Sequence, residues 1–227
     1  MKSTAKLVPR AAARTQPAPA RSAQLLDGLE DIFLREGFRR VTVGELAARL
    51  RCSRHTLYQL AAGKDALVIR VLDRLLSRIR RIGTEAAAAR SDLRERIVAL
   101  VEPGVSELRH ASNLFFSDVA GLPAAKRLLD HHQAARRAQA QELIDAGIRQ
   151  GTFRGLNSHL AAEVILAAVQ RIMEPAFLVD VRLSPSEAIR EAEELLLHGL
   201  LHLSGRKARR TRRGQRVRGV PKRLGGG

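Results

Sequence analysis

Residues 42–60 read TVGELAARLRCSRHTLYQL, and they carry the strongest local signals in the chain. Thr42, followed three residues later by Glu45, forms a capping box, in which each side chain accepts a hydrogen bond from a free backbone N–H at a helix start. Ser53 is a second residue of the type that caps helices. The stretch therefore predicts two short helices separated by a tight turn, the second of them ending near Leu60.

The second predicted helix is unusually polar for its length, and only Leu57 and Leu60 offer it apolar contacts. A helix–turn–helix places its second helix in the DNA major groove, which is about 12 Å wide. Two small core helices are the alternative, but hydrogen-bonding side chains suited to phosphates and base edges favour DNA recognition. The polar residues are Ser53, Arg54, His55, Thr56, Tyr58 and Gln59.

Helical spacing of apolar residues continues on both sides of this motif, with Leu25, Leu29 and Phe33 before it and a long amphipathic helix from Lys64 to about Ile82 after it. Gly37 is the expected end of the first helix. No alternating apolar run long enough for a strand is present, so the sequence predicts an all-α fold. Further helices are expected near residues 92–109, 113–120, 124–149, 158–179 and 185–203.

Proline and glycine set the expected breaks in the second half. Pro103-Gly104 is expected to kink or split the helix at 92–109, because proline cannot donate a backbone hydrogen bond. The motif Ser184-Pro185-Ser186-Glu187 is a clear start signal for the last helix.

The positive charge of the chain is concentrated at its two ends. The formal net charge is +17, from 40 Lys and Arg against 23 Asp and Glu. Residues 1–21 carry five basic residues and residues 204–227 carry ten, without a single acid. Positions 22–203 are left with 25 basic and 23 acidic residues, or +2. We therefore expect an almost neutral globular body with basic arms.

A set of short motifs resembles the TetR/AcrR family of bacterial transcription regulators. The resemblance runs without gaps from Gly37 to Leu67, and further along two segments look like the link that precedes this family's dimer helices. The first group comprises Gly37-Phe38, Val41-Thr42-Val43, Leu46-Ala47, Ser53-Arg54-His55-Thr56-Leu57-Tyr58 and Lys64-Asp65-Ala66-Leu67. The link comprises Ala146-Gly147-Ile148 and Gly151-Thr152-Phe153-Arg154.

The resemblance implies an N-terminal three-helix DNA-binding domain and a C-terminal helical domain that binds an effector and dimerises through helices near 158–179 and 185–203. The expected division is a flexible basic arm at 1–20, the helix–turn–helix domain at 21–66 joined by the helix at 64–82, the effector and dimerisation domain at 67–203, and a disordered basic tail at 204–227.

The chain departs from the family pattern around the turn. Arg51 stands where the family has a small residue, often glycine, and Cys52 stands where it has valine. Leu60-Ala61 replaces a favoured aromatic residue. The small Ala61 could loosen the junction with the helix that begins at Lys64, or Leu50, larger than the usual alanine, could fill the space.

Roles in DNA binding follow from side-chain chemistry together with the resemblance. Tyr58 is expected to donate to a phosphate, as is Lys64 with the amides that open its helix. Thr42 and Ser53 are expected to cap their helices and also contact phosphates. Base edges are assigned to Arg54, His55, Thr56 and Gln59, with Arg54 equally suited to phosphate. In the N-terminal arm, Arg14 or Arg21 could enter the minor groove.

The effector pocket is expected among the central helices and to be largely apolar. Phe115, Phe116, Met173 and Phe177 would line it, and His110, Asn113 or Gln170 would supply polar contacts.

Other functional classes find little support. His198 and His202, and the pair His131-His132, lack nearby partners at ligand spacing, so no metal and no cofactor are expected. Glycine-rich phosphate loops, nucleophile elbows and H-E-x-x-H are missing from the sequence, so no enzyme is predicted. No apolar run is long enough for a membrane span or a secretory signal, and a cytoplasmic protein is expected.

These observations predict a homodimeric, effector-responsive repressor that binds a palindromic operator on double-stranded DNA. One alternative is a sequence-tolerant nucleic-acid-binding protein dominated by its basic tails. The other is a helical ligand-binding or enzymatic protein with a vestigial helix–turn–helix.

Overall fold

The computed structural model describes residues 18–200, and this part of the chain folds into helices connected by turns, without a strand. The predicted all-α fold is confirmed. The ten helices of the described part are α1 Pro19–Glu36, α2 Val43–Arg49, α3 Arg54–Leu60, α4 Lys64–Ala88, α5 Leu93–Leu108, α6 Asn113–Gly121, α7 Pro123–Arg149, α8 Ser158–Ile172, α9 Pro175–Val181 and α10 Pro185–Leu200.

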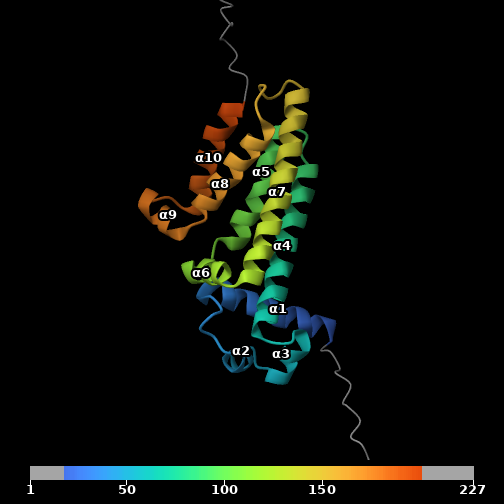
Figure 1. The fold of residues 1–227 in the computed structure, drawn as a ribbon, viewed down its shortest axis with the longest axis vertical. Coiled ribbons are helices and arrows are strands. Elements are labelled where there is room, and N and C mark those ends of the chain that lie inside the picture. The colour runs from blue at the N-terminus through green and yellow to red at the C-terminus, as the bar shows by residue number, and fades with distance from the viewer. Residues whose placement is uncertain (1–17, 201–227) are drawn as a thin grey trace, which may run out of the picture.

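The helices form an elongated molecule with the three N-terminal helices at one end (Figure 1). Helices α4, α5, α7, α8 and α10 form a bundle above them, and α4 runs from the end that holds α1, α2 and α3 into the bundle. Helix α1 begins at Pro19, inside the segment expected as an arm. Most of that arm and the tail at 204–227 lie outside the described residues.

The helix boundaries follow the capping signals of the sequence. The Thr42–Glu45 capping box is complete, with both reciprocal hydrogen bonds present. The hydroxyl of Ser53 accepts from the backbone N–H of Thr56. Gly37 ends α1 with φ of 74°, a left-handed conformation that glycine adopts without a steric cost.

Two predicted helix ends are wrong, and one expected helix split is absent. The helix expected at 158–179 is broken after Ile172, because Pro175 begins α9 and a proline ring clashes inside a continuing helix. Helix α5 is not split at Pro103 but runs through it from Leu93 to Leu108. Helix α4 extends past Ile82 to Ala88.

Close packing between α4 and α5 accounts for the longer α4. Its residue Gly83 faces the α5 backbone, and a Cβ there would lie only 2.8 Å from the carbonyl oxygen of Leu100. Glycine lowers intrinsic helix propensity by about 1 kcal/mol, which explains why the sequence pattern suggested an earlier end. Here the missing side chain lets the two helices approach, and tertiary packing outweighs the propensity.

Two separate apolar clusters stabilise the molecule. We call the first the lower core, which α1, α2, α3 and the first half of α4 build together with α6 and the start of α7. Its members include Leu29, Phe33, Leu46, Leu57, Leu72, Phe115 and Val119. The second, the upper core, lies among α5, the end of α7, α8 and α10, and includes Ile97, Leu100, Ile144, Phe153, Leu166 and Ile172. Each fully buried side chain of this kind contributes about 1.5–3 kcal/mol.

Candidate nucleic-acid interface and effector region

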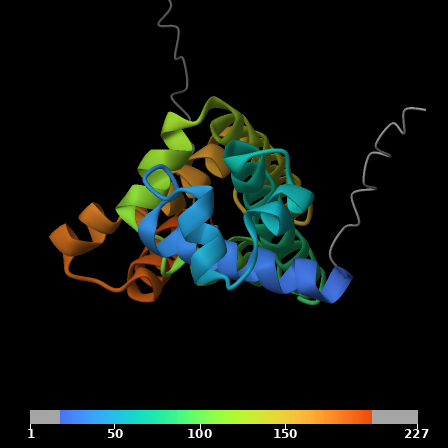
Figure 2. The same ribbon diagram turned by 90° about the horizontal axis from the view of Figure 1, so that it is seen from below.

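Helices α2 and α3 lie at the free end of the molecule, as the view from below shows (Figure 2). Leu46 of α2 and Leu57 and Leu60 of α3 are buried in the lower core, which fixes the rotation of both helices. The opposite face of α3 is therefore open to solvent. Residues 39–64 around it hold six basic side chains and one acid, so this end carries a local charge of +5.

The structure places the predicted DNA-contacting residues of α3 on or beside this open face. Arg54, His55 and Tyr58 are exposed, with Tyr58 44% accessible, whereas Thr56 and Gln59 are half-buried. The imidazole of His55 hydrogen-bonds the amide of Gln59 one turn later, at 3.2 Å. These two side chains are thus held side by side.

Arg54 lies differently from its neighbours. Its guanidinium covers the start of α2, where a Cβ on Gly44 would come within 2.7 Å of it. Gly44 therefore provides the space in which Arg54 rests across the two helices.

The two capping hydroxyls are already engaged within the protein. Thr42 Oγ1 donates to the carboxylate of Glu45 at 2.8 Å and accepts from the Glu45 N–H. The backbone N–H of Thr42 also donates to the Glu45 carboxylate, and this hydrogen bond, followed by the one from the hydroxyl, lowers the pKa of Glu45 below its usual value. Ser53 Oγ lies 2.8 Å from Thr56 Oγ1. A phosphate contact from Thr42 would require its hydroxyl hydrogen to turn away from Glu45.

Lys64 has a structural role that the sequence did not reveal. Its ammonium donates to the carbonyl oxygens of Arg39 and Val41, each at 2.8 Å. An ammonium has three N–H donors, so one remains available for a phosphate. Lys64 thereby ties the start of α4 to the segment that leads into α2.

The turn between α2 and α3 explains the departures from the family pattern. Arg51 has φ of 50°, the left-handed conformation for which glycine is favoured. Leu50 packs against α1, where a Cβ on Gly28 would lie 2.5 Å from its side chain, so the large residue fits because Gly28 has none. Cys52 packs against the lower core as expected for a small apolar residue, and burial raises its pKa.

Three side chains that position this end of the molecule carry no sequence signal, because their partners are distant in the chain. The carboxylate of Asp118 in α6 accepts from the backbone N–H groups of Phe38 and Arg39, each at 2.7 Å. Arg70 of α4 donates to the last carbonyl of α3 at Leu60. Arg78 of α4 pairs with Glu30 of α1 and Glu107 of α5.

The residues expected to form one effector pocket are distributed over different parts of the molecule. Phe115 is buried in the lower core and Phe116 packs against it, whereas Met173 and Phe177 pack against the upper core. Asn113 and Gln170 are exposed. His110 is exposed too and lines a cavity of about 550 Å³ between α5 and α10. The structure thus does not bring this set together.

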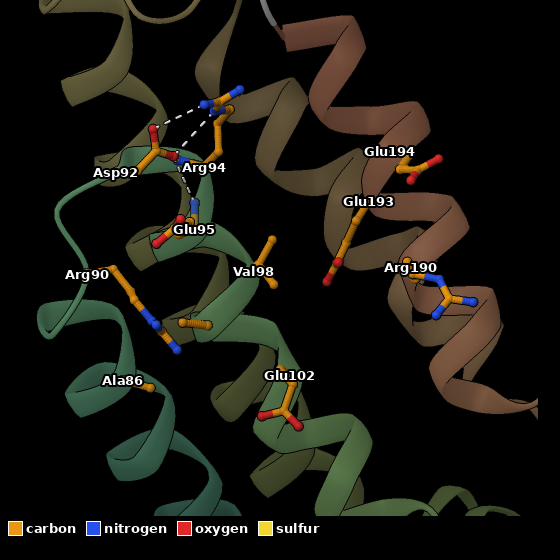
Figure 3. Close-up of a pocket in the computed structure, with 11 residues that line it drawn as sticks. Ala86, Arg90, Asp92, Arg94, Glu95, Val98, Glu102, Arg190, Glu193 and Glu194 are labelled. Carbon is orange, nitrogen blue, oxygen red and sulfur yellow. Dashed lines mark hydrogen bonds and ion pairs between the residues drawn. The ribbon is translucent and has the colours of Figure 1, made fainter.

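A neighbouring cavity of about 860 Å³ opens between the end of α4, the start of α5 and α10 (Figure 3). Its lining is charged rather than apolar. The charged residues are Arg90, Arg94 and Arg190 together with Asp92, Glu95, Glu102, Glu193 and Glu194. Burial and the proximity of Glu102 raise the pKa of Glu193. A smaller apolar cavity of about 30 Å³ lies between α5, α8 and α10 and is lined in part by Val101.

The described residues contain no group of three metal-ligating side chains. His131 is exposed and His132 buried, so the adjacent pair does not share one environment. The side chain of His198 and the whole of His202 lie outside the description. None of the described helices is long and apolar enough to cross a membrane.

Comparison with known proteins agrees with this geometry. Residues 25–71 match the family described as bacterial regulatory proteins, tetR family, and residues 89–192 match the tetracyclin repressor-like C-terminal domain. No curated protein sequence matches the chain.

Solved structures of similar fold include three regulators. A TetR-family regulator of Streptomyces coelicolor has 20% identity and a TM-score of 0.61, covering 80% of this chain and 96% of its own. FadR of Bacillus subtilis, in complex with stearoyl-CoA, has 15% identity and a TM-score of 0.64, covering 78% and 98%. A regulator of Saccharomonospora viridis, in complex with choline, has 17% identity and a TM-score of 0.68, covering 82% and 100%.

The helix–turn–helix geometry at one end, the helical domain beyond it and the two matched domains lead to one conclusion. This chain belongs to the TetR family of DNA-binding transcriptional regulators.

Proposed function

We propose that the protein is a homodimeric repressor that binds a palindromic operator through two α3 helices and is released by a small-molecule effector. The observation that carries this proposal is the open polar face of α3, at the positively charged end of the molecule. Phosphate contacts by Tyr58, Lys64, Thr42 and Ser53 would set the register. Base discrimination by Arg54, His55, Thr56 and Gln59 would contribute about 1–3 kcal/mol for each good contact.

Exposed apolar side chains support assembly through α8 and α10. Leu160 and Val164 on α8 are 61% and 46% accessible, and Leu195 on α10 is 77% accessible. A second copy covering these helices would remove that apolar surface from water. A twofold axis would also relate two recognition helices, and half-sites for such dimers lie about 34–36 Å apart.

Effector control follows from the continuous α4, which belongs to both the DNA-binding end and the bundle. An effector shifts DNA binding only by its difference in affinity between two conformations. Stearoyl-CoA and choline, held by the two structural neighbours, are chemically unlike each other, so the fold does not define an effector class. A regulator of chromosomal DNA would act in the cytoplasm.

Selection of bound DNA from a random pool at physiological salt tests the proposal. The full chain is compared with a chain ending at residue 203, which keeps every described helix. Recovery of the same inverted repeat by both would support sequence reading by α3. If removal of the tail abolishes all DNA binding and neither chain selects a motif, the results would instead favour the sequence-tolerant protein dominated by its basic tails.

Two variants separate base reading from phosphate contact. Gln59→Ala should relax the selected sequence at one position of each half-site, whereas Gln150→Ala, at the distant end of α7, should leave it unchanged. Tyr58→Phe should weaken binding to all sequences alike, by about 1 kcal/mol for one hydrogen bond. If both variants bind as the unaltered chain does, α3 is not the reading element and the vestigial helix–turn–helix alternative stands.

Tyr58 also offers a direct readout. The chain contains one tyrosine and no tryptophan, so its intrinsic fluorescence comes from the recognition helix alone. Titration with the selected DNA should change that emission, and titration with an unrelated duplex at the same salt should change it less.

A further inference from the structure

A buried basic layer separates the two apolar cores. On α7 the lower core ends near Leu129 and the upper core begins at Ala140, and between them lie His132 and Arg136. These side chains are only 4% and 5% exposed, and they are the buried polar side chains of the described residues. A charged group is costly to bury unless it is paired, so this layer requires an explanation.

Arg136 has no acidic partner among residues 18–200, the part of the chain that the structure describes. Its one hydrogen bond runs to the backbone carbonyl of Val101 on α5, at 3.3 Å, and its Nε has no partner. All 23 acidic side chains lie within residues 18–200, and none forms an ion pair with Arg136. Because Arg136 is enclosed within one chain, an acid from a second copy would not reach it without rearrangement of the bundle.

The surroundings of Arg136 do not neutralise its charge. His132 lies one turn earlier on the same face, and its Nδ1 has no hydrogen-bond partner. Arg80 of α4 and His131 are close enough to His132 to act on it electrostatically. The layer therefore combines a guanidinium fork with a neighbouring imidazole, a pair suited to an oxyanion.

Bare backbone and apolar surface lie beside this layer. Residue 104 on α5 is glycine, and a Cβ there would lie 3.4 Å from the guanidinium, so α5 presents bare backbone to Arg136. Val101 links the layer to the apolar cavity, since its carbonyl accepts from Arg136 and the residue lines the cavity between α5, α8 and α10. An elongated ligand could extend from a charged end at Arg136 into apolar surroundings.

We propose that the effector is an amphipathic anion whose carboxylate or phosphate group pairs with Arg136, with His132 as a second donor, and whose aliphatic part lies against the upper core. This inference deepens the proposed function and rests on it. The apolar cavity is much smaller than such a ligand, so binding must displace α5, α7 or α8. That displacement supplies the second conformation through which an effector can act.

A purely structural role for Arg136 makes the opposite prediction for stability. If its bond to Val101 mainly holds α5 to α7, Arg136→Met should lower the thermal midpoint. If Arg136 awaits an anion, the same change removes an unpaired buried charge and should raise the thermal midpoint of the ligand-free protein by roughly 2–4 °C.

The test uses three probes of equal chain length on the full-length protein: octanoate, octyl phosphate and octanol. Calorimetry should show that the unaltered chain binds one or both anions at least tenfold more tightly than octanol. The two anions then distinguish a carboxylate from a phosphate effector. Arg136→Met should abolish this preference while raising the ligand-free midpoint. The matched control is Arg137→Met, which removes an arginine paired with Glu163 at the surface and should leave anion binding unchanged.

Equal binding of octanol and both anions by the unaltered chain would overturn the proposal without recourse to any variant. So would a lowered midpoint for Arg136→Met with unchanged anion affinity. Should Arg136→Met not fold, Arg136→Lys keeps the charge without the planar fork, and it should still prefer an anion over octanol. DNA selection is measured separately on the same preparation. If the protein selects an inverted repeat but does not bind the anions, the effector inference is contradicted and the proposed function is not.

Discussion

Asp118 and Lys64 bind opposite sides of the same residue, Arg39. The Asp118 carboxylate accepts the backbone N–H of Arg39 at 2.7 Å, and the Lys64 ammonium donates to the carbonyl oxygen of that residue at 2.8 Å. Asp118 belongs to α6 and Lys64 begins α4. The segment that leads into the capping box at Thr42 is thus fixed from both α6 and the start of α4.

Replacing Asp118 by alanine should weaken this junction. Two backbone N–H groups, those of Phe38 and Arg39, would lose a charged acceptor, and we expect the free energy of unfolding to fall by about 2 kcal/mol. Urea unfolding measures the change. Asp130→Ala is the matched control, because Asp130 forms an exposed ion pair with Lys126 within one helix, and its loss should cost less than about 0.5 kcal/mol. Equal losses in the free energy of unfolding for the two variants would show that the Asp118 contacts stabilise the protein no more than an exposed ion pair does.

The left-handed residue in the recognition turn gives a prediction of the opposite sign. Arg51 has φ of 50°, a conformation that costs a residue with a side chain about 1 kcal/mol relative to glycine. Arg51→Gly should therefore raise the free energy of unfolding by up to about 1 kcal/mol, while Arg51→Val should lower it. Thermal unfolding of the two variants measures this difference in stability. A glycine variant less stable than the valine variant would rule out backbone strain at this position.

Gly28 and Leu50 should show energetic coupling. A Cβ on Gly28 would meet the Leu50 side chain at 2.5 Å, so Gly28→Ala should be better tolerated when Leu50 is also alanine. We expect a coupling free energy of about 1 kcal/mol from a double-mutant cycle. Additive effects within error would mean that Leu50 moves aside freely and that Gly28 is not needed to accommodate it.

The buried imidazole of His132 predicts a loss of stability on the acid side. Burial, and then the charges of Arg136 and Arg80, lower its pKa to about 4 in the folded protein. Between pH 6.5 and 4 the unfolded chain binds a proton that the folded chain does not. The free energy of unfolding should therefore fall as pH decreases through this window, by about 3 kcal/mol in total.

Urea unfolding at pH 7 and at pH 4.5 measures this dependence. His132→Gln should show a smaller difference between the two pH values, whereas His131→Gln, at the exposed neighbouring position, should match the unaltered chain. An unaltered pH dependence in the His132 variant would assign the acid sensitivity to carboxylates elsewhere.

Local signals in the sequence were sufficient to predict the helices that carry the candidate DNA-binding residues. Capping residues act within one turn of the chain, so the capping roles of Thr42 and Ser53 could be assigned without knowledge of the fold. The apolar spacing of α4 likewise identified the face that is buried. The same reasoning placed Tyr58 on the open side of α3, because its neighbours Leu57 and Leu60 had to face the core.

The contacts that tie elements together could not be predicted in this way. Asp118 binds residues about eighty positions away, and no spacing rule relates a carboxylate in α6 to the backbone after α1. Pro103 is expected from the sequence to kink or split its helix because its effect there is local and unfavourable, whereas the packing of α5 against α4 and α7, which accompanies an unsplit α5, is tertiary. The residues expected to form one effector pocket are apart for the same reason. Phe115 and Phe177 are both aromatic, but Phe115 lies in the lower core and Phe177 packs against the upper core.

The lower core also defines how the protein should come apart. Phe115 and Val119 of α6, and Ala125 of α7, pack among the helices of the DNA-binding end, so the boundary drawn after residue 66 does not separate two cooperative units. Amide hydrogen exchange should therefore report α6 and α1 opening together, with one opening free energy, while α8 exchanges independently. In this molecule the unit that opens cooperatively differs from the domain. The cooperative unit that contains the recognition helix also includes α6 and the start of α7, which belong to the domain that would sense the effector.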